Sequence, residues 1–379
     1  MKILVVTERR ADFSRFKPIL NLIKKEKKIN YHLVVTGLHL IKKYGYTINE
    51  IIENKFIVKD KFKMFDKKYN LENDGAAMSF AMGKAFCELS KILKKNKPDL
   101  ILSGFDIAAN FAVTVCGAHM NIPVAHIQGG EVSGTIDESL RHGMSKFSNF
   151  HFTANLETKK RLIKMGEISN NIFSVGCPSI DALVSEKEVA KKKILKKFKI
   201  DISKPYTIVI QHPVTSELSQ AEKQMIETIS ALKKFKIQHL IVFPNNDAGS
   251  NKILKIIKKS NLNFTPTLNL SEYKTLLKSC KILIGNSSSG VHEASTYKIP
   301  VVNIGTRQNG RAKPKNVINT GHSHREIVKA IKKGLNKKFA NKIKNIKNPY
   351  GDGTASKRIV NFIKKFDLKN FNTQKQITY

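Results

Sequence analysis

The residues in this chain best suited to chemistry form a turn of serine, asparagine and glycine. An apolar strand at Lys281–Ile284 leads into Gly285-Asn286-Ser287-Ser288-Ser289-Gly290, and Val291–Tyr297 is expected to be helical. Backbone N–H groups, hydroxyls and the positive end of a helix dipole together receive phosphate. Glu293 lies one turn into the helix, within reach of the hydroxyls of an attached sugar. Ser and Asn are also ordinary N-caps, but the whole arrangement suggests a site for a nucleoside diphosphate.

Two arginines strengthen this interpretation. The chain has nine arginines among its 67 basic residues, and Arg307 and Arg311 directly follow the next predicted strand, Pro300–Ile304. Both therefore return to the side on which the serine turn lies. A guanidinium matches phosphate or carboxylate as a planar fork, which lysine cannot do. In a chain so rich in lysine, the few arginines are expected to mark binding sites.

Composition narrows the class of protein. A length of 379 residues predicts two domains, and an apolar content of 41% is enough for proper cores. No apolar stretch approaches the roughly 20 residues of a membrane span, and the N-terminus enters a strand without a signal-peptide pattern. A cytoplasmic protein is expected, without a membrane partner.

Cysteine spacing and charge exclude two further classes. The four cysteines are far apart and lack the paired spacing of metal ligands, so we expect reduced, structural thiols and no metal. The formal charge of +37 comes mainly from lysines spread along nearly every helical segment, without interleaved aromatic residues. Solvated lysine faces are therefore expected in place of a nucleic-acid site.

Short β-branched or leucine-rich runs alternate with amphipathic segments along the whole chain, which predicts an α/β protein with parallel sheets. We expect two doubly wound, Rossmann-like domains with the active-site cleft between them. Residues 1–184 form the first domain, which is completed by a C-terminal helix in 354–379, and residues 185–353 form the second. The predicted strands are Ile3–Val6, Tyr31–Val35, Leu100–Leu102, Val124–Ile127, Phe150–Thr153, Ile172–Val175, Thr207–Ile210, Leu240–Phe243, Phe264–Thr265, Ile282–Ile284 and Val301–Ile304.

Polar clusters follow five of these strands, at the end where ligands bind in such sheets. In the first domain they contain Arg10 and Arg15, then Asp106, then Gln128, Glu131, Glu138 and Arg141. In the second domain they contain His212, then Asn245 and Asp247.

Six of the motifs resemble, in order, those of the hydrolysing UDP-N-acetylglucosamine 2-epimerases of the sialic-acid and legionaminic-acid pathways. They are Arg10–Phe13, Gly129–His142, Gly176–Ser179, His212–Thr215, Gly285–Gly290 and Gly305–Gln308, and the resemblance covers essentially the whole chain. It implies a GT-B-like fold, a homodimer, no cofactor and a nucleotide-sugar substrate. The nucleotide would bind to the second domain.

The resemblance also implies a reaction and a set of roles. UDP is eliminated across C1–C2 to give a glycal, and water then adds with inversion at C2. A carboxylate must accept the weakly acidic C2 proton while cations and dipoles stabilise the departing diphosphate. The implied catalytic residues are Glu131, Glu138, Asp106 and His212, the last placed beside the diphosphate; the leaving-group clamp contains Ser288, Ser289, Gly290, Arg10 and Arg307, and Glu293 binds the ribose.

Three positions depart from the family pattern. Phe105 stands where the family usually has an aspartate, with Asp106 one residue later, Gln128 stands where it often has a glutamate, and Glu8 replaces a glycine. A glutamine cannot act as a base. Two alternatives stay open: an inactive nucleotide-sugar-binding homologue, which Phe105 and Gln128 favour, and a GT-B glycosyltransferase, which would share the nucleotide-binding half and need no base at C2. The sugar also stays open between UDP-N-acetylglucosamine and a UDP- or GDP-linked di-N-acetylbacillosamine.

Overall fold

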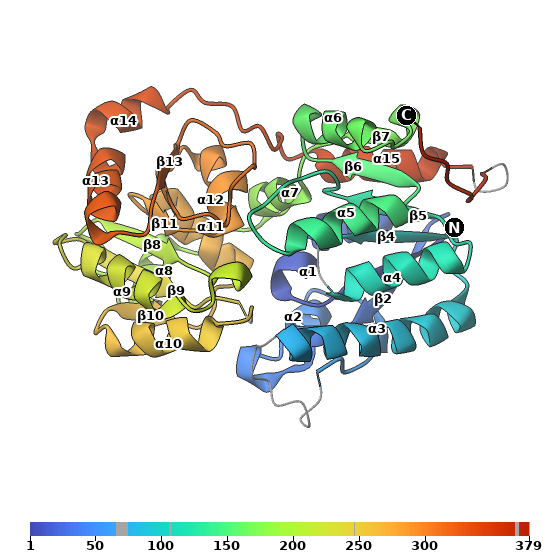
Figure 1. Ribbon diagram of the computed structural model, residues 1–379, viewed down its shortest axis with the longest axis horizontal. Helices are drawn as coiled ribbons and strands as arrows, with labels where there is room; N and C mark the ends of the chain where they lie inside the picture. The colour runs from blue at the N-terminus through green and yellow to red at the C-terminus, as the bar shows by residue number, and fades with distance from the viewer. Residues whose placement is uncertain (66–74, 106–107, 246, 368–370, 379) are drawn as a thin grey trace. The chain divides into compact units, whose positions relative to one another are not determined.

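The computed structural model describes residues 1–65, 75–105, 108–245, 247–367 and 371–378. The chain forms two compact units, each built on its own parallel sheet (Figure 1). Unit 1 comprises Met1–Glu131, Ile136–Ala182 and Tyr350–Tyr379, and unit 2 comprises Val132–Thr135 and Leu183–Pro349. The sequence places the boundaries after residue 184 and before residue 354, and gives no sign that residues 132–135 group with unit 2.

The sheet of unit 1 has the strand order β3-β2-β1-β4-β5-β6-β7, and every pair is parallel. Its strands are β1 (Lys2–Thr7), β2 (Asn30–Val35), β3 (Val58–Lys61), β4 (Leu100–Gly104), β5 (Val124–Ile127), β6 (Phe150–Thr153) and β7 (Ile172–Ser174). Its helices are α1 (Arg10–Ile23), α2 (Ile48–Glu53), α3 (Gly75–Asn96), α4 (Ala108–His119), α5 (Asp137–Phe147), α6 (Leu156–Lys164) and α15 (Ala355–Lys365), and α7 (Pro178–Ser185) leads into unit 2.

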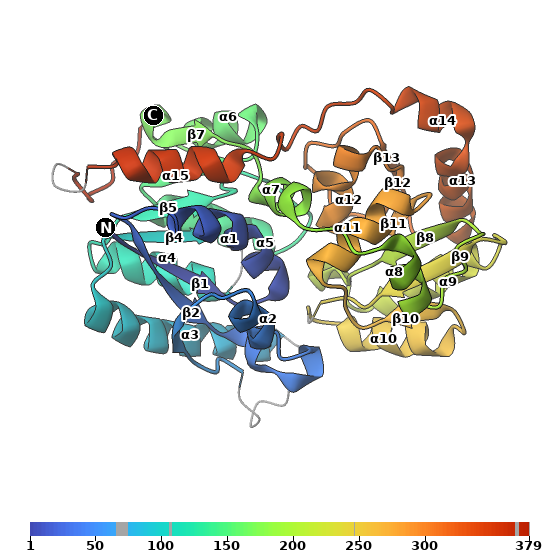
Figure 2. The ribbon, with the colours of Figure 1, turned by 180° about the vertical axis from the view of Figure 1, so that it is seen from behind.

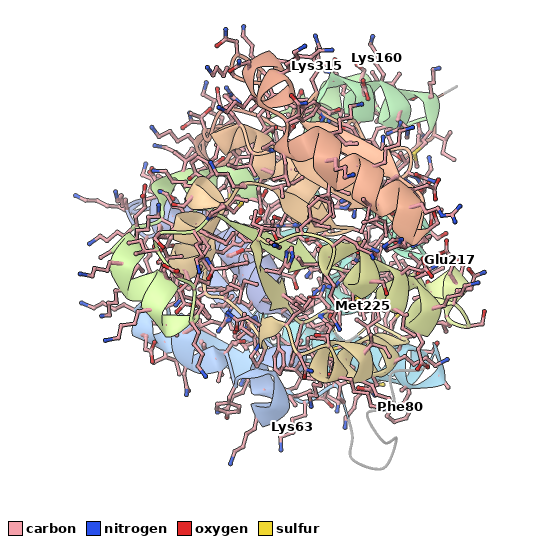
Figure 3. All side chains as sticks on the ribbon, turned by 90° about the vertical axis from the view of Figure 1, so that its left-hand side faces the viewer. Lys63, Phe80, Lys160, Glu217, Met225 and Lys315 are labelled. Carbon is pink, nitrogen blue, oxygen red and sulfur yellow. The ribbon has the colours of Figure 1, made fainter. Side chains whose placement is uncertain are left out.

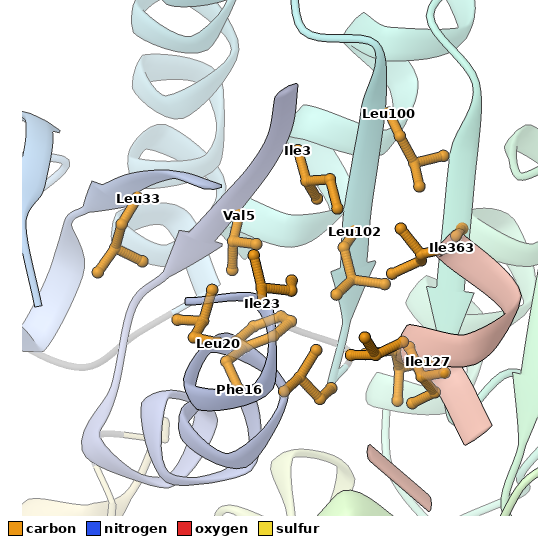
Figure 4. Packing of buried hydrophobic residues seen from close by; sticks show 14 of the residues in the cluster. Ile3, Val5, Phe16, Leu20, Ile23, Leu33, Leu100, Leu102, Ile127 and Ile363 are labelled. Carbon is orange, nitrogen blue, oxygen red and sulfur yellow. The ribbon is translucent and has the colours of Figure 1, made fainter. Parts of the chain in front are cut away.

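Helices cover both faces of this sheet, as a doubly wound fold requires. On one face, Phe16 and Leu20 of α1 and Ile363 of α15 pack on Val5 and Leu102 of the sheet (Figure 4). Figure 2 shows α15 on the same side of the sheet as α1. The other face is covered by α3 and α4. Each fully buried aliphatic side chain contributes roughly 1.5–3 kcal/mol, so the returning C-terminal helix is part of the core of unit 1.

The sheet of unit 2 has the order β10-β9-β8-β11-β12-β13 and is also parallel throughout. Its strands are β8 (Tyr206–Ile210), β9 (Gln238–Val242), β10 (Asn263–Thr265), β11 (Leu283–Gly285), β12 (Val301–Ile304) and β13 (Val317–Thr320). Its helices are α8 (Lys191–Lys197), α9 (Ala221–Leu232), α10 (Ser250–Lys259), α11 (Leu270–Ser279), α12 (Ser288–His292), α13 (His324–Leu335) and α14 (Lys337–Lys342). The predicted fold class, α/β with two doubly wound sheets, is confirmed.

The order of the strands reverses at one place in each sheet. In unit 1 the reversal lies between β1 and β4, and in unit 2 between β8 and β11. The crossover helices on the two sides of such a point lie on opposite faces, which opens a crevice at the carboxyl ends of the two strands, where ligands bind. These two switch points are where a site is expected.

The largest differences from the sequence prediction, beyond shifts of one or two residues in strand bounds, are two missing strands and one helix start. The strands β3 and β13 are absent from the prediction because both are short sheet edges; β3 reads Val-Lys-Asp-Lys and β13 has only two apolar residues in sequence. Helix α12 begins at Ser288, three residues before the predicted start, and ends at His292; a 3₁₀ turn over Ala294–Tyr297 follows. The side chain of Ser287 caps α12 by accepting a hydrogen bond from Ser289 N, so the helix starts inside the serine turn.

Lysine side chains project outward from the ribbon, as Lys63, Lys160 and Lys315 illustrate in Figure 3. The charge of +37 is thus distributed over many elements. Among the described residues, no helix is both long enough and apolar enough to cross a membrane.

Candidate active site

The switch point of unit 1 carries an acid that sequence reasoning did not assign to the site. Glu8 follows β1 and is only 3% exposed, and its Oε2 accepts a hydrogen bond from Ala109 N at 3.1 Å, in the first turn of α4. A carboxylate is stabilised at that end of a helix by the N–H groups and the dipole. Glu8 could have been suspected from its position alone, because it directly follows the strand at which the order reverses.

The next strand end, after β5, is shaped by two glycines. A Cβ on Gly129 would come within 2.9 Å of His126 Nδ1, and one on Gly130 within 2.6 Å of Thr158 O. Gly130 also has φ +77°, a conformation that favours glycine. The Gly-Gly pair therefore lets the chain turn tightly against α6, and this turn fixes the position of Glu131.

Glu131 is 3% exposed and lies in a hydrogen-bonded network. Its Oε1 accepts from Gln128 Nε2 at 3.1 Å, and the oxygen of Gln128 accepts from Arg15 Nη1 at 3.3 Å. Arg141, with no exposed surface, donates from Nη1 to the backbone oxygen of Glu131 at 2.7 Å. The structure thus brings three predicted site residues, Arg15, Gln128 and Arg141, together around the buried Glu131.

The other predicted residues of unit 1 are placed differently. Glu138 lies in the first turn of α5 with its Oε1 3.6 Å from His142 Nε2, and its side chain is 32% exposed. Burial, followed by the charge of Arg141, lowers the pKa of His142 below its usual value. Arg10, predicted to bind the leaving group, donates from Nε to Glu50 Oε2 at 2.7 Å. Asp106 lies outside the described residues.

At the switch point of unit 2, His212 is held by Asn286. The side-chain oxygen of Asn286 accepts from His212 N at 2.7 Å, and its Nδ2 donates to His212 O at 2.8 Å. Gly285, just before it, has φ +122°, and a Cβ there would collide with the carbonyl oxygen of Ile210. The close approach of β8 and β11 therefore requires glycine at 285, and it brings Asn286 against the histidine.

The imidazole of His212 has a defined tautomer. Asn245 N donates to His212 Nδ1 at 3.1 Å, so Nδ1 is the acceptor. In the neutral ring the proton then lies on Nε2. His212 is 6% exposed, and an N–H donor of this kind suits a group that stabilises an anion.

The serine turn follows Asn286. Ser287 Oγ accepts from Ser289 N at 3.3 Å, and Gly290 N donates to Ser287 O at 3.1 Å. The hydroxyl of Tyr273, on α11, is hydrogen-bonded to Ser289 Oγ. Burial, followed by the nearby charge of Glu293, raises the pKa of Tyr273 well above its usual value. Ser289 and Glu293 are therefore near a neutral hydroxyl that no motif in the sequence indicates.

The loop after β12 packs against the same asparagine. Gln308 Nε2 donates to Asn286 O at 2.8 Å, and Arg307 Nη1 donates to that oxygen at 3.4 Å. Arg307 Nη2 lies 3.6 Å from Asp247 Oδ2. Arg311 donates to Gln308 Oε1 at 3.0 Å and to Val132 O at 3.3 Å. Sequence reasoning found both arginines and missed Gln308, since a buried glutamine in a loop carries no distinctive pattern.

A metal centre has no support in the described ranges. No group of three or more His, Cys, Asp and Glu is placed to hold an ion among residues 1–65, 75–105, 108–245, 247–367 and 371–378.

The two doubly wound units, with a C-terminal helix that returns to unit 1, have a GT-B-like α/β fold. A solved UDP-GlcNAc 2-epimerase from Neisseria meningitidis, bound to UDP-GlcNAc, has the same fold, with a TM-score of 0.83 at 20% sequence identity over 97% of this chain and 100% of that one.

The family is shown by sequence. Residues 21–364 match the family model described as UDP-N-acetylglucosamine 2-epimerase. The chain is 33% identical over 372 residues to a UDP-N,N'-diacetylbacillosamine 2-epimerase (hydrolyzing) from Legionella pneumophila, covering 97% of this chain and 96% of that one. It is 31% identical to a UDP-N-acetylglucosamine 2-epimerase from Neisseria meningitidis, covering 87% and 86%. The chain belongs to the UDP-N-acetylglucosamine 2-epimerase family.

Proposed function

We propose that the chain is a hydrolysing 2-epimerase that converts a UDP-linked acetamido sugar into the free 2-epimer and UDP. The substrate would be UDP-N-acetylglucosamine or UDP-linked di-N-acetylbacillosamine, and GDP as the carrier remains an alternative. The free sugar would supply the synthesis of sialic or legionaminic acid. Membership of the family and the similarity to the hydrolysing relative from Legionella pneumophila support this direction.

The observation that carries the proposal is the position of Glu131. It is a buried carboxylate, 3% exposed, that follows β5. Gln128 binds its side chain and Arg141 binds its backbone oxygen, so both hold it in position. Removing a weakly acidic proton from a sugar carbon requires a carboxylate held in one position. Glu131 is the proposed base, and Glu138, in the first turn of the following helix, is a second proton-transfer group.

In the first step Glu131 takes the proton from C2, the C–H electron pair forms the C1–C2 double bond, and the C1–O bond breaks with its pair on UDP. In the second step water adds across the glycal, with its oxygen on C1 and a proton delivered to the opposite face of C2. The leaving diphosphate needs donors and cations. Unit 2 would supply them through the Nε2–H of His212, the serine turn Ser287–Gly290 and Arg307.

A second candidate is a nucleotide-sugar-binding protein without turnover. Phe105 and Gln128 favour it, because neither side chain can act as an acid or a base. The buried Glu131 beside Gln128 argues for retained chemistry.

Proton NMR in deuterated water separates the candidates. The chain would be incubated with UDP-N-acetylglucosamine and, separately, with UDP-linked di-N-acetylbacillosamine. An epimerase gives free 2-epimer with deuterium at C2, together with UDP. Binding of UDP without any product supports the inactive protein, and transfer of the sugar only when an acceptor is added supports a glycosyltransferase.

A further inference from the structure

Gln128 lies between a cation and the proposed base. We infer that Gln128 is a positioning residue whose amide keeps Glu131 ionised and oriented as a proton acceptor. The inference rests on the role proposed for Glu131. It gives a function to a residue that cannot itself take part in proton transfer.

The chemistry of the three side chains fixes the orientation of the amide. A guanidinium has only donors, so the atom of Gln128 that meets Arg15 Nη1, at 3.3 Å, is its oxygen. The amide nitrogen then faces Glu131 Oε1 at 3.1 Å and donates to it. A hydrogen bond donated to a carboxylate favours its charged form. The amide thus links the positive charge of Arg15 to the negative charge of Glu131.

The site is built around this arrangement. Gln128 and Glu131 are each 3% exposed. The guanidinium of Arg15 also lies over the ring of Phe105, 5.1 Å from its centroid. Phe105 and Gln128 have φ of +73° and +62°, conformations that cost free energy in residues other than glycine. Two unfavourable backbone conformations at neighbouring strand ends therefore serve to place the ring under Arg15 and the amide beside Glu131.

Other charged groups bind the backbone around Glu131. Arg141 of α5 donates to the backbone oxygen of Glu131 at 2.7 Å, and Arg161 of α6 donates to that of Gly130 at 2.6 Å. The Cys177 thiol interacts electrostatically with Glu131, and burial raises its pKa to about 11, so it is neutral. The surroundings thus supply positive charge. A Gln128→Glu substitution would put a second carboxylate against Glu131 in place of a donor.

Two carboxylates in contact cannot both ionise readily, and the apparent pKa of the pair rises. We expect Gln128→Glu to move the acidic limb of the kcat profile upward by about one pH unit or more, with KM within about twofold of wild type. Gln128→Met removes the donor without adding charge. It should lower kcat and shift the limb in the same direction by less. Unchanged kcat profiles in both variants would overturn the inference.

The matched control is Gln224→Glu in unit 2. Gln224 is 4% exposed and its Nε2 donates to Glu217 Oε2 at 2.6 Å, so the substitution creates an equivalent carboxylate pair elsewhere. The limb should stay where it is in wild type. A shift as large as that of Gln128→Glu would mean that added negative charge alone explains the result, and the inference would fall.

A second readout does not depend on turnover. With ¹³C-labelled glutamate, NMR follows the titration of the side-chain carboxyls in wild type, Gln128→Glu and Gln128→Glu/Glu131→Gln. A carboxyl that titrates at higher pH in Gln128→Glu, and is lost in the double variant, supports the inference even if wild type releases no UDP. In that case the proposed function alone fails. The absence of such a carboxyl refutes the inference, whatever the activity.

Discussion

The two switch points of this chain share the same reversal of strand order but carry different polar groups. In unit 1 the polar contacts involve charged groups: Glu8 accepts from the start of α4, and Arg15 is linked to Glu131 through Gln128. In unit 2 the contacts around His212 are made by a neutral amide and by backbone groups. The same doubly wound fold thus places a buried carboxylate and an arginine at one switch point and, around His212, a neutral amide and backbone groups at the other.

This difference separates the expected effects of substitution. A carboxylate that moves a proton contributes to the rate and little to nucleotide affinity, whereas donors on a diphosphate contribute to both. Variants in unit 1 should therefore change turnover, and variants in unit 2 should change nucleotide binding or the stability of the unit.

The largest effect is expected for Glu131→Gln. The variant keeps the shape of the side chain and loses the proton acceptor, so turnover should fall by roughly 100-fold or more while the Kd for UDP changes by less than about twofold. Product NMR gives the rate, and calorimetry gives the Kd. The control is Glu157→Gln, an exposed glutamate of the same unit. Unchanged turnover in Glu131→Gln would remove Glu131 from the reaction.

Arg307→Ala tests the role proposed for unit 2, which is to bind the diphosphate. Its guanidinium lies next to Asn286 O and Asp247, at the carboxyl edge of unit 2. A hydrogen bond to a charged group is worth about 1.5–3 kcal/mol, so the Kd for UDP should rise by roughly 10- to 100-fold. Calorimetric titration measures it, with Arg325→Ala, an exposed arginine on α13, as the control. Normal UDP affinity would show that Arg307 is not in the clamp.

Asn286→Ala should reduce both stability and turnover. It leaves the N–H and carbonyl of His212 without their side-chain partner in a buried place, at a cost of about 1–3 kcal/mol for each unsatisfied group. Thermal unfolding measures the loss. Asn303→Ala removes another buried amide, which donates to Asn319 Oδ1 at 3.0 Å. That control should lose stability and keep its turnover at temperatures below unfolding; equal turnover losses in both variants would contradict a specific role for Asn286.

The parts predicted well from sequence were those governed by local pattern. Strands β5 and β6 begin and end at the predicted residues, because each is a short run of strand-forming residues between turns. Glu131 and His212 were found because polar residues directly follow such runs. The edge strands β3 and β13 could not be found in this way, since an edge needs neither alternation nor a continuous apolar run.

The contacts that orient the site depend on the fold and could not be predicted. Asn286 was read as a member of the serine turn, yet its side chain faces back to His212, 74 residues away in sequence. Gln128 was noted for lacking basicity, and its position between Arg15 and Glu131 depends on three elements that meet only in the folded unit. Sequence patterns thus identify unusual residues such as Gln128. The residues that they contact are set by how the strands and helices are arranged in the fold.

The smallest effect is expected for a buried histidine of unit 1. His39 of unit 1 is fully buried between Thr7 Oγ1 and Thr47 Oγ1, and burial, with the charge of Arg10, lowers its pKa to about 3. An unfolded histidine titrates near pH 6.5, so this neutral imidazole favours folding fully above that value. The contribution is lost as pH falls from about 6.5 toward 3, since the unfolded chain binds the proton first.

Between pH 7.5 and pH 5.5, His39 should therefore lower the free energy of unfolding by about 1.4 kcal/mol. His39→Gln keeps a polar side chain that can bond to the two threonines and does not titrate, so this part of the pH dependence should vanish. Denaturant unfolding of both proteins at the two pH values measures it, and His119→Gln, at an exposed histidine, should keep the wild-type dependence. If wild type and His39→Gln lose equal stability over this interval, the imidazole of His39 is not held neutral in the folded protein. His39 would then be a further charged group in the polar contacts of unit 1.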